Sequence, residues 1–377
     1  MTLDKPLTSN RDKLLYTPGP LTTSATVKAA MLRDLGSRDQ EFMAVVRAIR
    51  QKLLAIGGQT DESLFTVVPM QGSGTFGVEA AISSIVPRDG KLLVIINGAY
   101  GKRIAQMASV YQINAHLLQT AENVLPDLQA IDATLSNDSA ITTVAVVHCE
   151  TTTGVLNPIE RIGEIVRRHK RVYFVDAMSS FGAIPINLAD SSIDYLVSSS
   201  NKCIEGVPGF SFALARKEAL LATQGYARTL ALNLLAQWQE LEKTGQFRYT
   251  PPTHVMMAFH QALLELDAEG GVPARAARYK QNHDTLLAGM RDLGFRAYLP
   301  PELQSYIITT FYYPEHPNFD FETFYQTLND KGFVIYPGKL GDMPCFRLGN
   351  IGRLYPQDMI DLVGAIKDTL VEMNIVL

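Results

Sequence analysis

A lysine and an aspartate each follow a short apolar run, and together their side chains could carry out chemistry. Asp176 ends the run 172–176, and Lys202 stands after the run 195–200, just before a glycine-flanked loop. Desolvation lowers the pKa of a lysine amine and makes it a nucleophile able to form a Schiff base. Taken singly, the lysine could merely extend to the surface and the aspartate could be a helix N-cap.

The sequence around this pair indicates that both residues lie at the ends of parallel strands. Apolar residues occupy consecutive positions in 172–175, as expected of a strand covered on both faces. Ligands of open α/β sheets bind at the carboxyl ends of the strands, so Asp176 and Lys202 can face one crevice. Pyridoxal phosphate needs this pair, a lysine for its aldehyde and a carboxylate that keeps its pyridine nitrogen protonated. We therefore predict pyridoxal 5'-phosphate as the cofactor.

A glycine-rich segment lies between a predicted strand at 64–68 and a predicted helix at 78–85. Small residues at the start of a helix let backbone N–H groups approach an anion, and the helix dipole adds to the attraction. This pattern predicts a phosphate-binding segment with Ser73, Gly74 and Thr75 as donors.

The same glycines also form a G-x-G-x-x-G pattern, so a dinucleotide-binding protein is an alternative. That reading needs an acidic residue at the end of the next strand to hold a ribose. The predicted strand 92–96 ends in Asn97 instead, and a hydride-transfer enzyme would leave Lys202 without a role.

Further candidates follow other predicted strands. Tyr100 comes after the strand 92–96 and can stack on a flat cofactor ring. Thr151 lies in a cluster of donors and acceptors after the strand 142–147, where it can hydrogen-bond the cofactor. His148, in the same cluster, fits a buried structural histidine better than a base.

Arg347 stands among apolar residues and glycines in the segment 345–352. Its guanidinium is always charged and offers a planar fork of donors, which suits a carboxylate or a phosphonate. The alternative is a structural arginine paired with a carboxylate of another domain.

Composition narrows the classes of protein. The 377 residues are 46% hydrophobic and 19% charged, as in a globular chain of two or three domains, and a net charge of -4 argues against nucleic-acid or anionic-membrane binding. Cys149, Cys203 and Cys345 stand far apart, which indicates neither a zinc site nor a disulfide framework and suits a cytoplasmic protein. No stretch of about 18 apolar residues predicts a membrane span.

The order of elements predicts two domains. Strands alternate with helices from 64 to about 215, which predicts a doubly wound, mainly parallel α/β sheet. A long helix is expected over 219–243 and another over 255–268, with a domain junction at 269–273. We expect a large domain over 20–270 and a smaller α+β domain of 1–19 plus 271–377, with strands near 295–299, 305–312, 333–336 and 344–348 and helices near 320–331 and 356–373.

The chain resembles the fold-type I pyridoxal-phosphate enzymes, specifically the class V aminotransferases, over essentially its whole length. The motifs that carry the resemblance are Thr17-Pro-Gly-Pro-Leu21, Gln71-Gly-Ser-Gly74, Asn97-Gly-Ala-Tyr-Gly101, the segments 148–154 and 175–182, and the segments 201–209, 333–338 and 345–352.

The resemblance implies a role for each candidate. Lys202 would bind the cofactor aldehyde and move protons, and Asp176 would pair with the pyridine nitrogen. Tyr100 would stack on the ring, and Thr151 would hydrogen-bond the cofactor. The phosphate would be held by Ser73, Gly74, Thr75 and Asn201, with Thr250 reaching it from the neighbouring subunit of a homodimer. Gly19 and Arg347 would contact the substrate.

The implied activity is transfer of an amino group from a small-molecule amine to a keto acid. The resemblance favours an aminophosphonate as the donor and pyruvate as the acceptor, and the alternative is an amino acid donor such as alanine or serine. A cysteine desulfurase would need a mobile nucleophilic cysteine, whereas Cys345 lies in a predicted strand and is expected to pack. A non-catalytic protein of the same fold would not need Lys202.

Overall fold

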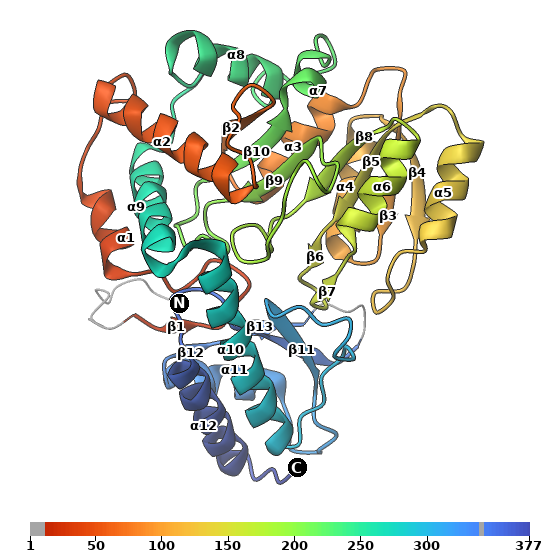
Figure 1. Cartoon of the computed structure of the whole chain (residues 1–377). Helices are drawn as coiled ribbons and strands as arrows, with labels where there is room; N and C mark the ends of the chain where they lie inside the picture. Colours follow the sequence, from red (N-terminus) through yellow and green to blue (C-terminus); the bar gives the residue numbers. More distant parts are fainter. Residues whose placement is uncertain (1–11, 339–342) are drawn as a thin grey trace.

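The computed structural model of the chain describes residues 12–338 and 343–377. Its upper lobe is built on a seven-stranded sheet (Figure 1). Across the sheet the strands follow the order β2 (Phe65–Gln71), β10 (Phe210–Arg216), β9 (Tyr195–Ser199), β8 (Val172–Asp176), β5 (Ile141–Val147), β3 (Lys91–Ile96) and β4 (Asn114–Gln119).

The sheet is mainly parallel, as predicted. Only β10 runs against its two neighbours, β2 and β9, whereas β9, β8, β5, β3 and β4 pair in parallel. The register of β5 and β8 sets Val147 opposite Asp176. The residues that follow β5, β8 and β9 therefore emerge at one edge of the sheet.

Helices cover both faces of the sheet, so the doubly wound α/β fold is confirmed. Neighbouring strand residues such as Leu93 and Val94 belong to different apolar cores because side chains alternate along a strand. One core includes residues of α2 (Gln40–Ile56), α5 (Leu128–Asn137), α6 (Ile159–Arg168) and α9 (Thr253–Glu269). The other includes residues of α3 (Gly74–Ile85), α4 (Ala99–Val110), α7 (Lys217–Leu221) and α8 (Leu234–Thr244).

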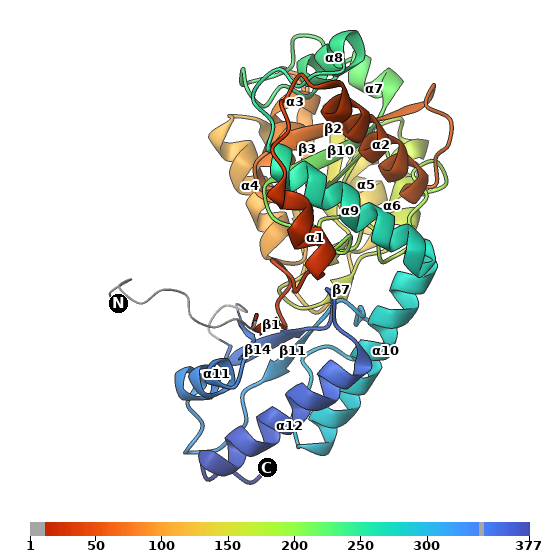
Figure 2. The same cartoon turned by 90° about the vertical axis from the view of Figure 1, so that its left-hand side faces the viewer.

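The lower lobe has its own sheet and apolar core, and Figure 2 shows α10 (Gly271–Asp292) descending into it from α9. Its three-stranded antiparallel sheet has the order β11 (Ile308–Tyr312), β14 (Cys345–Gly349) and β13 (Tyr336–Pro337). The short strand β1 (Leu14–Leu15) pairs with β12 (Phe333–Val334), and α11 (Phe321–Asp330) and α12 (Pro356–Glu372) complete the lobe.

Four short elements complete the described structure. The α1 helix (Ala25–Ala29) and a 3-10 turn (Ala30–Leu32) contact α9. The strands β6 (Cys149–Glu150) and β7 (Val155–Leu156) form a small hairpin that follows β5 and reaches toward the lower lobe (Figure 1).

Two sequence predictions about elements are wrong. The single helix expected over 219–243 is two helices, α7 and α8, and the segment between them contains Gly225 with a non-helical φ of +84°. In the same segment the guanidinium of Arg228 donates to the carbonyls of Val86 and Pro87. The strand expected at 295–299 is reduced to one isolated bridge between Ala297 and Phe311. Both segments have apolar periodicity, but tertiary contacts override it.

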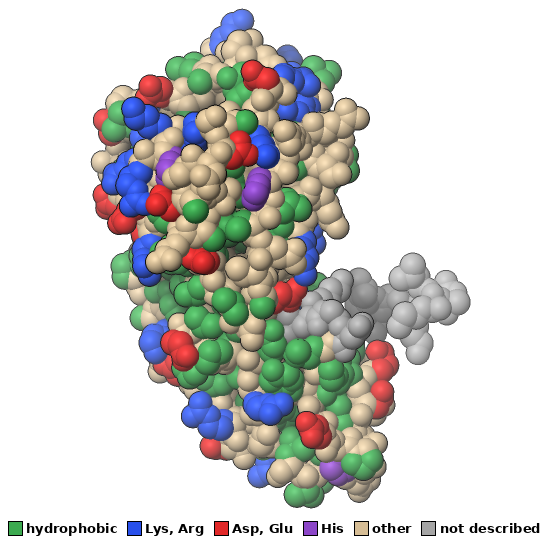
Figure 3. Space-filling view, turned by 90° about the vertical axis from the view of Figure 1, so that its right-hand side faces the viewer, with side chains coloured by type: hydrophobic (Ala, Val, Ile, Leu, Met, Phe, Trp, Pro, Cys, Tyr) green, Lys and Arg blue, Asp and Glu red, His purple; other side chains and the backbone are tan. Residues whose placement is uncertain are grey.

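The surface turned to the viewer in Figure 3 carries charges of both signs, interspersed over the upper lobe, and apolar side chains gather where the lobes meet. Within 12–338 and 343–377, no helix combines the length and the apolar character needed to cross a bilayer. Residues 1–11 of the predicted small domain lie outside the described residues.

Candidate active site

Lys202 lies in the turn after β9, at the edge where the strand ends meet. Its Nζ donates a hydrogen bond to the carbonyl oxygen of Pro18 at 2.6 Å. Desolvation lowers the pKa of the Lys202 amine to about 8, so a substantial fraction is neutral near physiological pH. Gly19 packs directly on this amine, since a β-carbon there would lie 2.9 Å from Nζ, and its φ of +131° favours glycine.

Asp176 ends β8 and is 3% exposed. Its Oδ1 accepts a hydrogen bond from the backbone N–H of Met178 at 2.9 Å. Burial raises the pKa of this carboxyl to about 6, against the opposing effects of that hydrogen bond and of the charges on Lys202 and Arg103. The buried carboxylate is stabilised by any cation that approaches its free oxygen, such as a protonated ring nitrogen.

The amino end of α3 points its first N–H groups into the same region. Ser73 is the N-cap residue, and its side chain makes no capping hydrogen bond. The first N–H groups of a helix have no acceptor within it, so those of Gly74 and Thr75 are available to an anion. The hydroxyl of Thr75 accepts a hydrogen bond from Nη1 of Arg103 at 3.4 Å, which adds a cation.

Tyr100 lies in the first turn of α4, which a buried glutamate holds in place. The carboxylate of Glu150, fully buried, accepts the N–H groups of Tyr100 at 3.2 Å and Gly101 at 2.8 Å. Desolvation raises the pKa of Glu150 to about 7. On the Tyr100 ring lies the guanidinium of Arg103, 4.9 Å from the centroid.

Several of these residues line one small cavity of about 30 Å³. Among its lining residues are the predicted Gly74, Thr75, Tyr100 and Asp176, together with Arg103. These residues come from three separate segments, the starts of α3 and α4 and the end of β8, and the sheet edge brings them together as the sequence predicts.

Arg347 reaches the site from β14 of the lower lobe and is 2% exposed. Its Nη1 donates to the carbonyl of Thr151 at 2.8 Å, and its Nε and Nη2 donate to the carbonyl of Pro337 at 3.1 and 2.9 Å. A guanidinium has five N–H groups, so one on each Nη is left for a ligand. In the described part of the chain Arg347 has no carboxylate partner, which disfavours the alternative of a structural ion pair.

The remaining predicted residues, Thr151, Asn201 and Thr250, do not line the small cavity. Thr151 is buried, and its carbonyl oxygen accepts a hydrogen bond from Arg347. Asn201, next to Lys202, accepts a hydrogen bond from the Ser199 hydroxyl at 3.2 Å. Thr250 is exposed on a loop, and its carbonyl accepts a hydrogen bond from the Gln71 side chain of its own chain at 3.2 Å.

His148 is buried, as expected of a structural residue. Its Nδ1 lies 2.9 Å from the Ser180 hydroxyl, and desolvation lowers the pKa of the imidazole to about 3. The ring is therefore neutral at physiological pH and a weak base.

Glu150 and Arg103 have site roles that sequence reasoning missed. Glu150 stands in the cluster 148–154, and an acidic residue three positions after the end of an apolar strand was the available signal. A β-carbon on Gly98 would collide with the Glu150 carboxylate, so the glycines before and after Tyr100 make room for it. The sequence does not indicate a site role for Arg103, because a single arginine on a predicted helix is common on protein surfaces.

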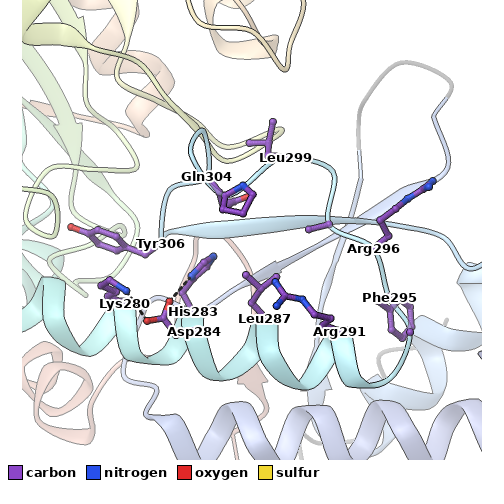
Figure 4. A pocket seen from close by; sticks show the side chains of 13 residues that line it. Lys280, His283, Asp284, Leu287, Arg291, Phe295, Arg296, Leu299, Gln304 and Tyr306 are labelled. Carbon is purple, nitrogen blue, oxygen red and sulfur yellow. Dashed lines mark hydrogen bonds and ion pairs between the residues drawn. The ribbon is translucent and has the colours of Figure 1, made fainter.

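A much larger cavity, of about 590 Å³, lies on the lower lobe between α10 and the segment 294–306 (Figure 4). Lys280, His283 and Arg291 are among the residues that line it, and none of the predicted site residues does. Another cavity, of about 700 Å³ between residues such as Lys52, Pro185 and Pro273, also contains none of the predicted site residues, so cavity size does not identify the site of the reactive amine.

The donor set at the strand ends fits pyridoxal phosphate. A desolvated amine, a buried carboxylate, an aromatic ring and a helix amino end are the four groups that its aldehyde, ring nitrogen, ring face and phosphate require. Asp176, Tyr100 and the amino end of α3 line the small cavity, and Lys202 follows the strand next to the one that Asp176 ends. Arg347 comes from the lower lobe, and one N–H on each Nη makes no hydrogen bond to the described residues.

Comparisons with known proteins agree with this chemistry. The aminotransferase class-V family matches residues 21–353. Curated relatives named 2-aminoethylphosphonate–pyruvate transaminase include one from Vibrio vulnificus (strain CMCP6), 51% identical over 95% of this chain and 97% of the relative. Another, from Syntrophobacter fumaroxidans, is 52% identical over 95% of this chain and 96% of the relative.

Solved structures show the same fold at low sequence identity. A ureidoglycine–glyoxylate aminotransferase from Bacillus subtilis matches with a TM-score of 0.89 at 20% identity, covering 98% of this chain and 95% of that one. An alanine–glyoxylate aminotransferase from Nostoc sp. matches with a TM-score of 0.88 at 24% identity, covering 98% of each chain.

Proposed function

The chain belongs to the class V aminotransferases, and we propose that it transfers the amino group of 2-aminoethylphosphonate to pyruvate. The products are phosphonoacetaldehyde and alanine, a step in phosphonate degradation. Relatives that carry this name are about half identical to the chain over nearly their whole length.

The observation that carries the proposal is Arg347, which is buried and, within residues 12–338 and 343–377, has no carboxylate partner. Burying a guanidinium without an acidic partner is costly unless a ligand supplies one. Two N–H groups, one on each Nη, can fork onto two oxygens of a phosphonate or of a carboxylate. One arginine therefore serves the acid group of 2-aminoethylphosphonate and that of pyruvate in turn.

We propose pyridoxal phosphate as the cofactor, as is general in this family. When bound, its ring withdraws electrons and stabilises the charge left on a substrate carbon that has lost a proton. The residues that would hold it are Lys202 at the aldehyde, Asp176 at the ring nitrogen, Tyr100 on the ring face, Thr151 at the ring edge, and Ser73, Gly74, Thr75 and Asn201 at the phosphate.

Lys202 moves the proton in this scheme. Because desolvation lowers the pKa of its amine to about 8, Nζ has a neutral fraction that can accept a proton from the donor carbon. The carbonyl of Pro18 and the close packing of Gly19 orient the amine toward the crevice. Arg347 holds the acid group, so the carbon that loses its proton lies between two fixed points.

The assembly and the compartment are also proposals. A homodimer would let Thr250 of a second copy reach the phosphate, which fits its exposed position. The division into a large unit at 20–270 and a small unit of 1–19 plus 271–377 follows the two sheets and the start of α10 at Gly271. The three cysteines are buried and stand far apart in the sequence, which suits a cytoplasmic enzyme.

A donor and acceptor panel tests the activity. The purified enzyme is supplied with 2-aminoethylphosphonate, alanine or serine as donor and with pyruvate or glyoxylate as acceptor, and the products are quantified. We expect kcat/KM to be highest for 2-aminoethylphosphonate with pyruvate. A clear preference for alanine or serine as donor would keep the family and reject the proposed substrate.

A further inference from the structure

Four buried or partly buried charges meet where the Lys202 turn touches α10. They are the carboxylates of Glu205 and Glu269 and the guanidinium groups of Arg275 and Arg278. Arg278 Nη2 lies 2.6 Å from Glu205 and Arg278 Nε lies 2.8 Å from Glu269, while Arg275 lies 3.4 Å from Glu205 and 2.8 Å from Glu269. Arg275 is fully buried, and Glu205 is 3% exposed. The two positive and two negative charges balance within the cluster.

On one side this cluster holds the backbone of the Lys202 turn. Glu205 lies three residues after Lys202, and its N–H donates to the Lys202 carbonyl at 2.7 Å. Arg275 Nη1 donates to the carbonyl of Cys203 at 2.6 Å, and the Tyr279 hydroxyl donates to Glu205 at 2.6 Å. Glu205 also has a φ of +66°, a left-handed conformation that costs a side-chain-bearing residue energy unless its surroundings enforce it.

On the other side the cluster holds the segment that follows Arg347. Arg278 Nη1 donates to the carbonyls of Gly352 at 2.7 Å and Leu354 at 2.8 Å. The N–H of Gly352 donates to the Tyr279 hydroxyl at 3.0 Å. Since β14 carries Arg347 and ends at Gly349, these contacts fix the strand end only a few residues from the guanidinium.

We infer that Glu205 is a positioning residue that fixes the distance between the Lys202 amine and the Arg347 guanidinium, and so determines the length of the donor. The inference rests on the proposed function, in which those two groups hold the two ends of one substrate. The Glu205 carboxylate is the group that joins the Lys202 turn to both arginines and to Tyr279. Through them the turn is tied to α10 and to the Gly352 segment across the lobes.

A structural carboxylate elsewhere on β9 gives a matched control. Asp194 lies before the opposite end of this strand, where it accepts the N–H of Tyr173 and pairs with Arg216 at 2.8 Å. It is mostly buried and does not contact the Lys202 turn or the lower lobe in the described structure. Replacing Asp194 by Asn therefore removes a buried charge of the upper lobe without touching the proposed link.

The experiment compares the holoenzyme with its Glu205→Gln, Glu205→Gly and Asp194→Asn variants. Glycine adopts a φ of +66° without strain, so Glu205→Gly isolates the side-chain contacts from the backbone strain. Kinetics use 2-aminoethylphosphonate and 3-aminopropylphosphonate, which is one CH₂ longer. Hydrogen exchange of the backbone amides is followed in peptides covering 200–206 and 349–355.

We expect Glu205→Gln and Glu205→Gly to lower kcat/KM for the shorter donor by about tenfold or more, because small misplacements of reacting groups are costly. The ratio of kcat/KM for the shorter donor to kcat/KM for the longer donor should fall by a similar factor. Amide exchange should accelerate in both segments together. Asp194→Asn should leave the preference and both segments unchanged, even if it lowers the melting temperature.

Each outcome bears on the inference. An unchanged donor preference and unchanged exchange in both Glu205 variants would overturn it, as would an equal change in Asp194→Asn. If the glutamine variant does not fold, Glu205→Asp keeps the charge and should shift preference and exchange in the same direction by less. A wild-type enzyme that ignores both phosphonates would reject the proposed function, and the paired exchange of the two segments would then decide the inference alone.

Discussion

Lys202 and Glu205 stand three residues apart in one turn, yet their surroundings differ: the Glu205 carboxylate has partners of opposite charge, and the Lys202 amine has a neutral one. Desolvation lowers the pKa of the Lys202 amine to about 8, and in the described structure its one hydrogen bond goes to a carbonyl oxygen. Glu205 is equally enclosed, but two guanidinium groups and a tyrosine hydroxyl surround its carboxylate. The Lys202 amine is therefore available to react. The Glu205 carboxylate is hydrogen-bonded by Arg278 and Tyr279 and serves to hold the backbone of the turn in place.

The same contrast holds between the two arginine sites. Arg347 is buried against carbonyl oxygens and, within the described residues, has no carboxylate, whereas Arg275 and Arg278 share two. Because an unpaired buried cation is costly, it marks a place where a ligand completes the structure. The paired arginines mark where two lobes are joined.

Removing the reactive amine should give the largest effect. Lys202→Ala is expected to lower kcat by about 10⁴-fold, since both the covalent and the proton-transfer roles of Nζ are lost. Steady-state kinetics measure the loss, and circular dichroism checks the fold. Lys91→Ala, which removes the partner of Asp138 at the opposite edge of the sheet, serves as the control and should keep normal rates. Near-normal turnover in Lys202→Ala would contradict the assignment.

Breaking the paired cluster should chiefly affect stability. Arg275→Gln leaves Glu269 with one cation fewer, and we expect the free energy of unfolding to fall by about 3–5 kcal/mol. Urea unfolding followed by circular dichroism measures it. Lys280→Ala, from an exposed pair with Asp284, should change stability by less than about 1 kcal/mol. Equal effects of the two substitutions would show that the buried cluster does not stabilise the fold.

Replacing the fork of Arg347 by a single charge should give a smaller effect on catalysis. Arg347→Lys keeps the charge but cannot hold two oxygens at once, so kcat/KM should fall by about 10²-fold for both donor and acceptor. The absorption of the bound cofactor should stay unchanged. A loss confined to one of the two substrates would reject a shared acid-binding site.

Glu150 should make a smaller contribution to the free energy of unfolding, and this contribution should depend on pH. Burial raises the pKa of its carboxyl to about 7 in the folded chain, above the unfolded value near 4.5. The folded state therefore holds this proton more tightly, and the stabilisation present below about pH 4.5 is lost as the pH rises through 7. Relative to Glu150→Gln, the wild-type stability should fall between pH 5 and 8 by at most about 1.4 kcal/mol per pH unit. Parallel pH profiles would contradict the raised pKa.

Much of the upper lobe could be predicted because its signals are local. Apolar runs such as 172–175 and 92–96 mark strands, glycines mark the amino end of α3, and Asp176 and Lys202 end their strands. These signals place the chemistry at one edge of a sheet. Contacts between distant segments leave no such trace, so the hydrogen bonds of Glu150 to the Tyr100 turn went unseen.

The errors of the sequence reading have the same origin. The segment between α7 and α8, expected to be helical, is instead held by Arg228, whose guanidinium donates to carbonyls about 140 residues away. The charged residues of α10 resemble an ordinary exposed helix face, and only the folded chain shows that Arg275 is fully buried against Glu269 and Cys203. Sequence motifs therefore predicted the position of the reactive residues. The contacts between the two lobes could be seen only in the structure.

The most direct test is an absorption spectrum of the purified enzyme with each substrate added alone. Addition of 2-aminoethylphosphonate without a keto acid should remove the yellow absorption of the cofactor bound through Lys202, and pyruvate should restore it. Such a cycle would establish the cofactor, the donor and the acceptor together. A yellow protein that ignores this amine but bleaches with alanine or serine would contradict the proposed substrate, and a protein unable to take up the cofactor would contradict the account as a whole.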